Sequence, residues 1–389
     1  MVTLYDVARH AGVSIATVSR VLHGQGSVRE DTRARVRSAI DELGYVPDSA
    51  AQSLARNRKD VIGLVAVEHT GLTPDQYDIE SMSLLFYDEV MRGVEGQIRD
   101  QHWSLLITFL GEDDTLGTTP EEVEPVQSRL MALLGKVDGL LIGEGILPPQ
   151  VLSRLAKRLA VVVIAGDTAQ KGVDVVAADN WSGAHALVEH LVADHGRQRL
   201  FHIDGPATAP DAKERRRAMH AVIDAYPGTT LVGSYNGRFS VDSGRQGTRA
   251  LLDADGELPD ALICANDQMA IGALRALADK GIRVPDDIAV VGFDDIFPAS
   301  LCDPPLTTVH QAIRKLGERA CERLTQRIAD PTLRPTLEIL PTELVLRSSC
   351  GCPAGMVERQ LVPHVPHRRP AGARRILQPV APEPPTAER

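Results

Sequence analysis

The chain has 389 residues, a length that predicts two or three domains rather than one. Apolar residues make up 43% and charged residues 24%, as in ordinary globular proteins, and no apolar run reaches the ~18–20 residues that a membrane span requires. The first residues are polar and contain no basic segment followed by an apolar one, so we expect no signal peptide and a cytoplasmic location.

The formal net charge of −10 argues, taken alone, against a protein that binds nucleic acid. The charge is unevenly distributed, however. Residues 1–58 contain eight Arg, no Lys and six acidic residues, a net charge of +2, so the rest of the chain is acidic. A small cationic head on an acidic body suits a regulator that must not bind DNA indiscriminately.

The five cysteines are odd in number and scattered, which does not indicate a disulfide framework. Cys350 and Cys352 are separated by one Gly, but two thiols without Cys or His partners at metal-binding spacing are a weak metal signal. The twelve His show no such spacing either. We therefore expect structural or incidental cysteines, no metal site and no cofactor.

Two short helices joined by a turn are predicted at the N-terminus. Thr3 and Asp6 form a capping-box pattern, Gly12 is a natural helix end, and Ser14 can cap a second helix. This is the helix-turn-helix pattern, in which the second helix enters the major groove of DNA.

A third helix is predicted to begin at a capping box of Ser27 and Glu30 and to end at Gly44. The pattern alone is equally compatible with a three-helix bundle that has no role in DNA binding.

The amino-acid sequence of this segment is more specific than its helical pattern. The run VTLYDVARHAGVSIATVSRVL, followed by REDTRARV and ELGYVPDSAAQSLA, closely resembles the LacI/GalR family of repressors. The resemblance is continuous over residues 2–56 and resumes in the following domain to about Arg347. It implies a helix-turn-helix domain over residues 1–46, a hinge helix over 47–58 and an effector-binding, dimerising domain over 59–350.

The resemblance places Ile15, Ala16 and Arg20 where the family's recognition helix faces base edges. Arg20 alone could make a bidentate contact to guanine, whereas Ile15 and Ala16 offer apolar contact, for example to a thymine methyl group. Side chains with hydroxyl groups are candidates for phosphate contacts, which position the protein without specifying sequence: Thr3, Tyr5, Ser14, Thr17 and Ser19. Helix capping by these hydroxyls and packing of Tyr5 against the first helix remain alternatives.

The hinge reads DSAAQSLAR after Pro47 and is too short to be a stable helix alone. In the family this segment folds when two copies meet on the operator, and Leu54 matches the residue that wedges a base step in the minor groove. An apolar wedge of this kind kinks the duplex and lets more protein contact DNA. The alternative is a plain linker with Leu54 packed on the next domain.

From Val61 onward, apolar strand-like runs alternate with helical ones, which favours parallel, doubly wound sheets. The predicted strands are 61–67, 103–110, 139–142, 161–165, 200–204, 261–265 and 288–293, and the predicted helices include 86–101, 181–194 and 267–280. The fold class is thus an all-α head followed by a sensor of two doubly wound α/β subdomains. The resemblance adds that the sensor is periplasmic-binding-protein-like and holds its ligand between the subdomains.

The sequence contains no dinucleotide fingerprint, nucleophile elbow or Walker A loop, so we expect no enzymatic activity. The alternative from another class is a ligand-binding or enzymatic α/β protein whose N-terminal bundle is a protein-interaction module.

The resemblance assigns effector contacts to Arg215, Phe239, Asn266 and Asp294. An Arg, an amide and a carboxylate can grip a polyol through several hydrogen bonds, and ligands of open α/β sheets bind at the carboxyl ends of strands. Each residue has a simpler alternative: Asn266, or an Asp at 294 or 295, could cap a helix, and Arg215 could be a solvated helix charge.

Three departures from the family pattern argue against a simple hexose as the effector. Ala165 and Gly166 stand at a strand end where many sugar-binding relatives have an acid, Ala218 replaces a usual Gly, and the segment 70–83 is longer than usual.

Residues 351–389 form a Pro- and Arg-rich tail whose composition predicts disorder, without the leucine heptads that some relatives use to form tetramers. We therefore expect a nucleoid-associated homodimer whose partners are operator DNA and a sugar-like effector, with no membrane contact. Whether the effector is an inducer or a corepressor, and whether the protein represses or activates, stays open.

Overall fold

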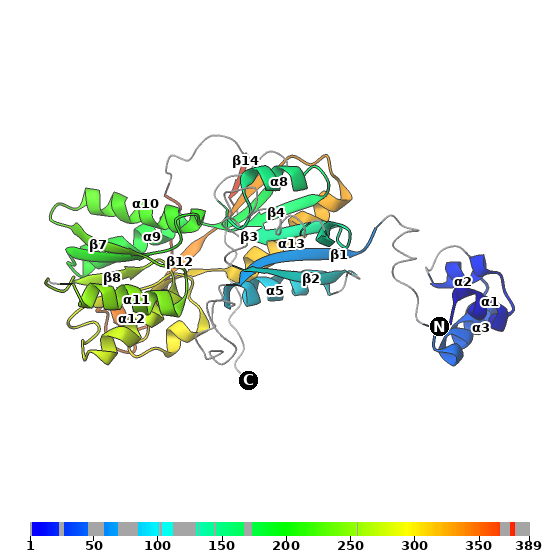
Figure 1. The fold of residues 1–389 in the computed structure, drawn as a ribbon, viewed down its shortest axis with the longest axis horizontal. Helices are drawn as coiled ribbons and strands as arrows, with labels where there is room; N and C mark the ends of the chain where they lie inside the picture. The colour runs from blue at the N-terminus through cyan, green and yellow to red at the C-terminus, as the bar shows by residue number, and fades with distance from the viewer. Residues whose placement is uncertain are drawn as a thin grey trace. The chain divides into compact units, whose positions relative to one another are not determined.

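The computed structural model describes residues 2–22, 27–45, 58–68, 85–99, 101, 103–111, 130, 132–143, 145–166, 173–254, 256–365 and 374–377. The chain divides into two compact units, Met1–Asp60, here called the head, and Val61–Arg389, here called the sensor domain (Figure 1). The predicted hinge, including Leu54, lies outside the described residues apart from Arg58.

Over residues 2–22 and 27–45, the head is a bundle of three helices, α1 (Leu4–Ala11), α2 (Ile15–Leu22) and α3 (Glu30–Leu43). Its core is small and is built from apolar residues at helical spacing on all three helices, namely Val7, Ala8, Ala11, Val18, Val21, Val36 and Ala39. The predicted capping box of Thr3 and Asp6 opens α1, and Gly12 ends it with φ 63°, a left-handed conformation that suits glycine.

The capping box predicted for the third helix is wrong. Helix α3 begins at Glu30, and its N-cap is Arg29, which makes no side-chain cap hydrogen bond. Glu30 therefore occupies the first helical position rather than the third, from which a Glu side chain could reach back to the cap. Gly44 ends the helix as predicted.

One subdomain of the sensor domain is built on a seven-stranded, all-parallel sheet with the order β14-β11-β5-β4-β3-β1-β2. Its strands are β1 (Val61–Glu68), β2 (Ser104–Gly111), β3 (Gly139–Gly143), β4 (Ala160–Ile164), β5 (Asp174–Ala178), β11 (Thr336–Leu340) and β14 (Arg374–Leu377). Helix α8 (Pro149–Leu155) contributes to one core, whereas α5 (Leu85–Ile98) and α13 (Ile313–Ala329) contribute to another.

A second parallel sheet, of order β7-β6-β8-β9, forms the other subdomain (Figure 1). Its strands are β6 (Arg199–Asp204), β7 (Thr230–Asn236), β8 (Ala261–Cys264) and β9 (Ala289–Val291). Helices α9 (Asn180–Glu189) and α10 (Pro210–Ala225) pack in one core, and α11 (Val241–Leu252) and α12 (Asp267–Asp279) in another. Two doubly wound subdomains are therefore confirmed.

The predicted disorder of the tail is wrong for its first part. Strand β13 (Glu358–Leu361) pairs antiparallel with β12 (Thr342–Leu346), which in turn pairs with β10 (Thr308–Gln311). The composition of the tail did not predict this strand because β13 is a fully exposed edge strand. Backbone hydrogen bonds to β12 and the ion pair of Arg359 with Asp295 hold it, rather than burial of apolar side chains.

The described part of the sensor domain also contains short helical turns: η3 (His190–Asp194), a π-helical turn that continues α9, and the 3₁₀ turns η4 (Phe297–Leu301) and η5 (Ser348–Cys350). Among the described residues, no helix combines the length and the apolar character needed to cross a bilayer.

Candidate DNA-binding and effector sites

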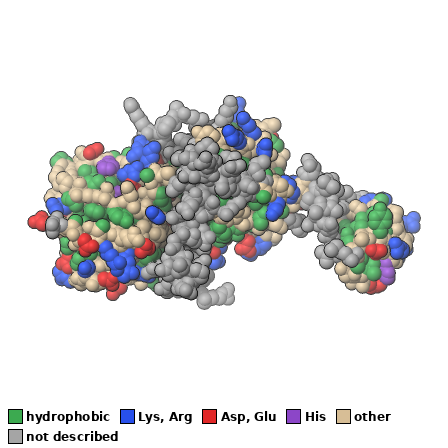
Figure 2. Space-filling model, viewed as in Figure 1, with side chains coloured by type: hydrophobic (Ala, Val, Ile, Leu, Met, Phe, Trp, Pro, Cys, Tyr) green, Lys and Arg blue, Asp and Glu red, His purple; other side chains and the backbone are tan. Residues whose placement is uncertain are grey.

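The second helix of the head presents the residues expected to face DNA. Ala16 and Arg20 are exposed, whereas Ile15 is half-buried and packs against the core of the head. Arg20 Nε donates to the carbonyl of Ala16 at 3.2 Å, so its guanidinium rests along its own helix. Hydrophobic and basic side chains lie side by side on the visible face of the head (Figure 2). Ile15 thus has a core role that leaves only part of its side chain for a base.

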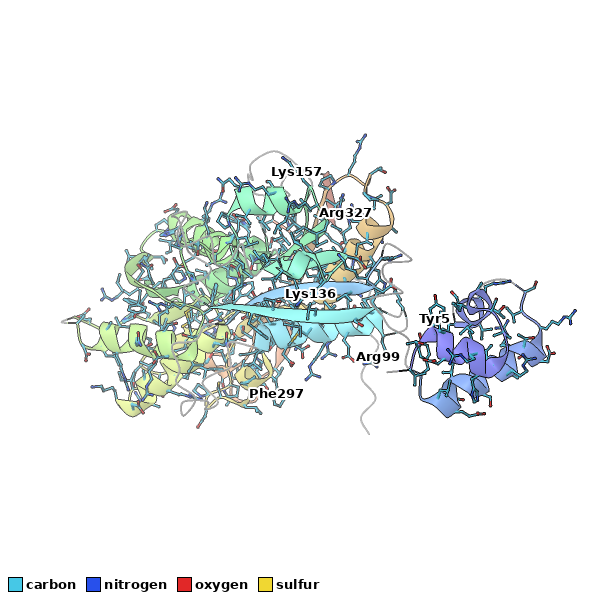
Figure 3. The ribbon with its side chains drawn as sticks, turned by 45° about the vertical axis from the view of Figure 1, so that its right-hand side comes forward. Tyr5, Arg99, Lys136, Lys157, Phe297 and Arg327 are labelled. Carbon is cyan, nitrogen blue, oxygen red and sulfur yellow. The ribbon has the colours of Figure 1, made fainter. Side chains whose placement is uncertain are left out.

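The candidate hydroxyl groups of the head differ in their contacts and exposure. Thr3 Oγ1 accepts from the backbone of Asp6, and Ser14 Oγ accepts from the backbone N–H of Thr17 at 3.2 Å, so both residues cap helices. Ser19 is half-buried. Tyr5 is 68% exposed, so the alternative in which its ring packs against the first helix is wrong (Figure 3).

The turn between α1 and α2 is held by Arg35 of α3. Its Nη2 donates to the carbonyl oxygens of Ala11 at 2.6 Å and Gly12 at 3.3 Å, which are among the carbonyls that a helix end leaves without partners. Because the turn fixes the angle between the two helices, Arg35 helps to position α2.

The predicted effector residues lie along one edge of the four-stranded sheet. Asn266 follows β8, and Asp294 follows β9. These strands are parallel, so their carboxyl ends meet at the same edge, the usual place for a ligand in an open α/β sheet.

Arg215 is buried at the centre of this edge, with a side chain only 5% exposed. Its Nε donates to Asn180 Oδ1 at 2.8 Å, and its Nη1 donates to the carbonyl of Ala265 at 2.6 Å and lies 3.5 Å from Asp294 Oδ1. The guanidinium carbon stacks 3.8 Å from the centroid of the Phe293 ring. The alternative of a solvated helix charge is therefore wrong for Arg215.

Asp294, which faces Arg215, has a strongly raised pKa. Burial raises its pKa to about 7, even though Arg215 and the Gln311 amide, which donates to its Oδ1 at 2.6 Å, favour the charged form. Its φ of 124° is outside the range that non-glycine residues normally adopt. Buried charge and strained backbone in one residue are features of functional sites more often than of structural ones.

Asn266 and Phe239 are in contact. Asn266 Oδ1 accepts from the backbone of Met269 and so caps α12, as the simpler alternative predicted, while its Nδ2 donates to the carbonyl of Phe239 at 3.2 Å. Phe239 follows β7 with φ 59°, and its half-buried ring lies against Gly205 after β6. The structure thus brings all four predicted residues to one edge.

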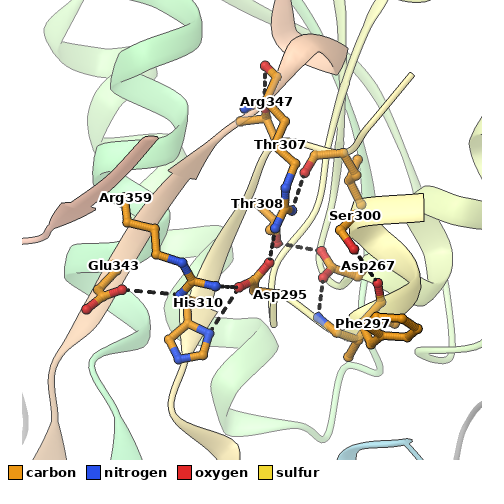
Figure 4. Close-up of polar contacts among 12 residues, drawn as sticks. Asp267, Asp295, Phe297, Ser300, Thr307, Thr308, His310, Glu343, Arg347 and Arg359 are labelled. Carbon is orange, nitrogen blue, oxygen red and sulfur yellow. Dashed lines mark hydrogen bonds and ion pairs between the residues drawn. The ribbon is translucent and has the colours of Figure 1, made fainter. Parts of the chain in front are cut away.

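Asp295, next to Asp294, has a structural role (Figure 4). Its carboxylate contacts His310 of β10 at 3.2 Å, Arg347 after β12 at 2.6 Å and Arg359 of β13 at 2.6 Å. Burial opposes its charge, but these partners outweigh burial and lower its pKa. Asp295 therefore ties the end of β9 to the three-stranded sheet rather than capping a helix.

Two neighbours of Arg215 were not predicted from the sequence. Asn180 starts α9 directly after β5, and Asp211 Oδ2 lies 3.5 Å from Arg215 Nη2 within α10. Their signals were present: Asp179 and Asn180 follow a buried strand, and Asp211 stands four residues before Arg215 on one helix.

Both units of the chain are similar to known proteins. Residues 3–48 match the family of bacterial regulatory proteins of the lacI type, and residues 188–350 match a periplasmic binding protein-like domain. The ribose operon repressor of Halalkalibacterium halodurans is 34% identical over 90% of this chain and 97% of its own length. This chain belongs to the lacI family.

Other lacI-family proteins are similar over the same span. An HTH-type transcriptional repressor PurR from Mannheimia succiniciproducens is 32% identical over 90% of this chain and 98% of its own. A lac repressor dimer bound to operator and the anti-inducer ONPF is 29% identical with a TM-score of 0.74, and covers 90% of this chain and 99% of its own. A complex of the regulator CelR with cellobiose is 30% identical, with a TM-score of 0.62 and coverage of 90% and 100%. This lacI-family protein is therefore a DNA-binding transcription regulator, not an enzyme.

Proposed function

We propose that this protein represses transcription as a homodimer on a palindromic operator in the cytoplasm, and that a sugar or related polar metabolite held at Arg215 and Asp294 sets its affinity for DNA. The observation that carries the proposal is the buried guanidinium of Arg215, which faces an amide, a carboxylate and the ends of two parallel strands. The head supplies the DNA-reading helix, and the sensor domain supplies the switch.

The chemistry at the edge of the sheet suits a ligand with several hydroxyl groups. A guanidinium offers donors in a fixed plane, and the carboxylate of Asp294 offers acceptors, so adjacent hydroxyls could bridge the two. Phe239 adds an apolar face beside them. The names of relatives point the same way, since one is a ribose operon repressor and another was solved with cellobiose.

The two-fold symmetry of a dimer would place two recognition helices on half-sites of a palindrome. An effector that binds one arrangement of the subdomains better than another shifts the population and changes operator affinity by about 1–3 kcal/mol. Leu54 is the residue that would link this shift to DNA, as a wedge in the minor groove.

The first test is binding of the full chain to the DNA upstream of its own gene, followed by fluorescence anisotropy at two salt concentrations. We expect tight, salt-dependent binding to one palindrome that is weakened by Arg20→Ala and by Leu54→Ala, because each removes a different class of contact. Equal binding to unrelated DNA would contradict the proposal.

The effector site is tested by screening pentoses, disaccharides and nucleosides for a change in that anisotropy. Arg215→Lys keeps the charge but loses the planar fork, so it should abolish the response to the ligand found. The matched control is Arg249→Lys on α11. The Arg249 side chain is 50% exposed, pairs with Asp279 at 3.8 Å and is not one of the proposed effector contacts. Loss of the response in both variants would count against Arg215 as a ligand contact.

A further inference from the structure

Four side chains that the sequence separates widely meet at one point of the sensor domain. His190 and His195 lie at the end of α9 and η3, and Cys350 and Cys352 lie at the end of η5. The ligand atoms of these four residues, two imidazole nitrogens and two sulfurs, all lie within 4.8 Å of one another. All the cysteines are free thiols.

The π-helical turn brings the two histidines together. In an α-helix, residues five apart point in directions that differ by roughly 140°, because each residue advances 100°. The i to i+5 repeat of a π turn instead stacks such residues. His190 and His195 are five apart across η3, and their Nε2 atoms are 3.1 Å from each other.

Gly351 lets the two cysteines reach these rings. It has φ 115°, and a Cβ there would come within 3.2 Å of His195 Nδ1. Glycine is thus the residue that permits both the backbone conformation and the close approach of the Cys350–Cys352 segment to η3.

The distances fit tetrahedral zinc. With Zn–S of about 2.3 Å and Zn–N of about 2.0–2.1 Å, tetrahedral geometry requires roughly 3.6 Å between S and N and roughly 3.3 Å between two N atoms. Cys350 Sγ is 3.5 Å and Cys352 Sγ is 3.6 Å from His190 Nε2, and Cys352 Sγ is 3.5 Å from His195 Nε2. With the N–N distance of 3.1 Å, four of the six edges match the required tetrahedron.

The surroundings are those of metal ligands. His190 Nδ1 lies 2.7 Å from Asp194 Oδ2, the carboxylate–histidine arrangement that fixes a ligating imidazole. The Thr307 hydroxyl lies 3.1 Å from Cys350 Sγ and can donate to a thiolate.

We propose that His190, His195, Cys350 and Cys352 form a structural zinc site. Four protein ligands leave no open position, and His190 and Cys350 are buried, so the site is of the closed structural type rather than catalytic. Two thiols and two imidazoles in a tetrahedron select zinc over the harder divalent ions. The ion would fasten the segment after β12, which leads into β13, to the end of α9.

The test is the metal content of the full chain, purified without chelators in a non-thiol reductant and measured by mass spectrometry of its metals. We expect about one zinc ion per chain. Cys352→Ser should lose it, while Cys302→Ser, which alters a half-buried thiol outside the cluster, should keep it. Exchange of zinc for Co²⁺ in the unmodified chain should give the intense visible bands of tetrahedral cobalt and a thiolate charge-transfer band.

The cobalt spectrum does not depend on whether any variant folds. Octahedral cobalt bands, or a reduced and folded chain that retains no zinc after exposure to Zn²⁺ and gel filtration, would overturn the proposal. Equal zinc contents in Cys352→Ser and the unmodified chain would do the same. A Cys350–Cys352 disulfide in protein isolated from a reducing cytoplasm would also overturn it, because a disulfide cannot ligate zinc in this way.

Discussion

Replacing Asp294 by Asn should stabilise the sensor domain while abolishing its response to the effector. Burial raises the pKa of Asp294 from 3.8 to about 7, so holding this group charged costs free energy in the folded state. The difference corresponds to roughly 4 kcal/mol above pH 7. An amide of the same shape avoids that cost, and its oxygen can still accept from Gln311.

The sign of the pH dependence follows from the raised pKa. Between about pH 4 and 7 the folded chain holds a proton on Asp294 that the unfolded chain has lost, so this residue's contribution to stability falls as pH rises. The advantage of Asp294→Asn should therefore grow by roughly 3 kcal/mol between pH 5 and pH 8, a gain of several degrees in Tm.

The assay is thermal unfolding of both chains at pH 5, 6, 7 and 8, with the exposed Asp253→Asn as a control that should show no growing difference. Pairing each variant with the unmodified chain cancels the titrating groups that do not interact with Asp294. The charge of Asp294 also helps to raise the pKa of the buried Asp267, so removing that charge changes the stability difference in the same direction. A variant that is less stable than the unmodified chain at pH 8 would refute the reasoning, because it would mean that the attraction to Arg215 outweighs burial.

Three further predictions concern the head and the frame of the sensor domain. Arg20→Ala should cost about 1–3 kcal/mol on the operator and remove discrimination at one G·C pair, whereas an equal loss on all sequences in anisotropy would assign Arg20 to phosphate. Arg35→Met should destabilise the head by about 1–3 kcal/mol by freeing two carbonyls, measured as an earlier melting of the head with the sensor transition unchanged; a shift of both transitions would contradict it. Asp174→Ala should destabilise the sensor domain by about 3–5 kcal/mol in urea unfolding, because Arg323 and Arg327 would lose their buried carboxylate. An effect below about 1 kcal/mol would mean that these two ion pairs are not needed for stability.

The sequence predicted the strands β3 and β8, which are buried on both faces, and also the partly exposed edge strand β2, but it missed the buried strand β5. Residues 139–143 and 261–264 are continuous apolar runs, and the structure buries every residue of both strands. Strand β7 was missed because it is an edge strand whose residues alternate between exposed and half-buried. Strand β11 was missed for another reason: it returns from late in the chain to pair with β5, and no local pattern encodes such a distant pairing.

The candidate sites were predictable to different degrees. Arg215 and Asp294 were found through a resemblance, and the structure brings them together at strand ends, but their partner Asn180 comes from the end of a strand in the other sheet. The His and Cys cluster was missed because its halves lie about 160 positions apart, as the contact between His190 and Cys350 illustrates. The spacing of His190 and His195 does fall within the range of zinc-binding histidine pairs and could have been a signal.

The π turn at His190–Asp194 also makes the cluster sensitive to the length of this helix. A π turn accommodates one residue more than an α-helical turn. A relative whose helix is one residue shorter here would carry its second histidine on another side of the helix, even if both cysteines were retained. We therefore expect the extra residue, the Cys-Gly-Cys segment and the two histidines to occur together in relatives that bind the metal.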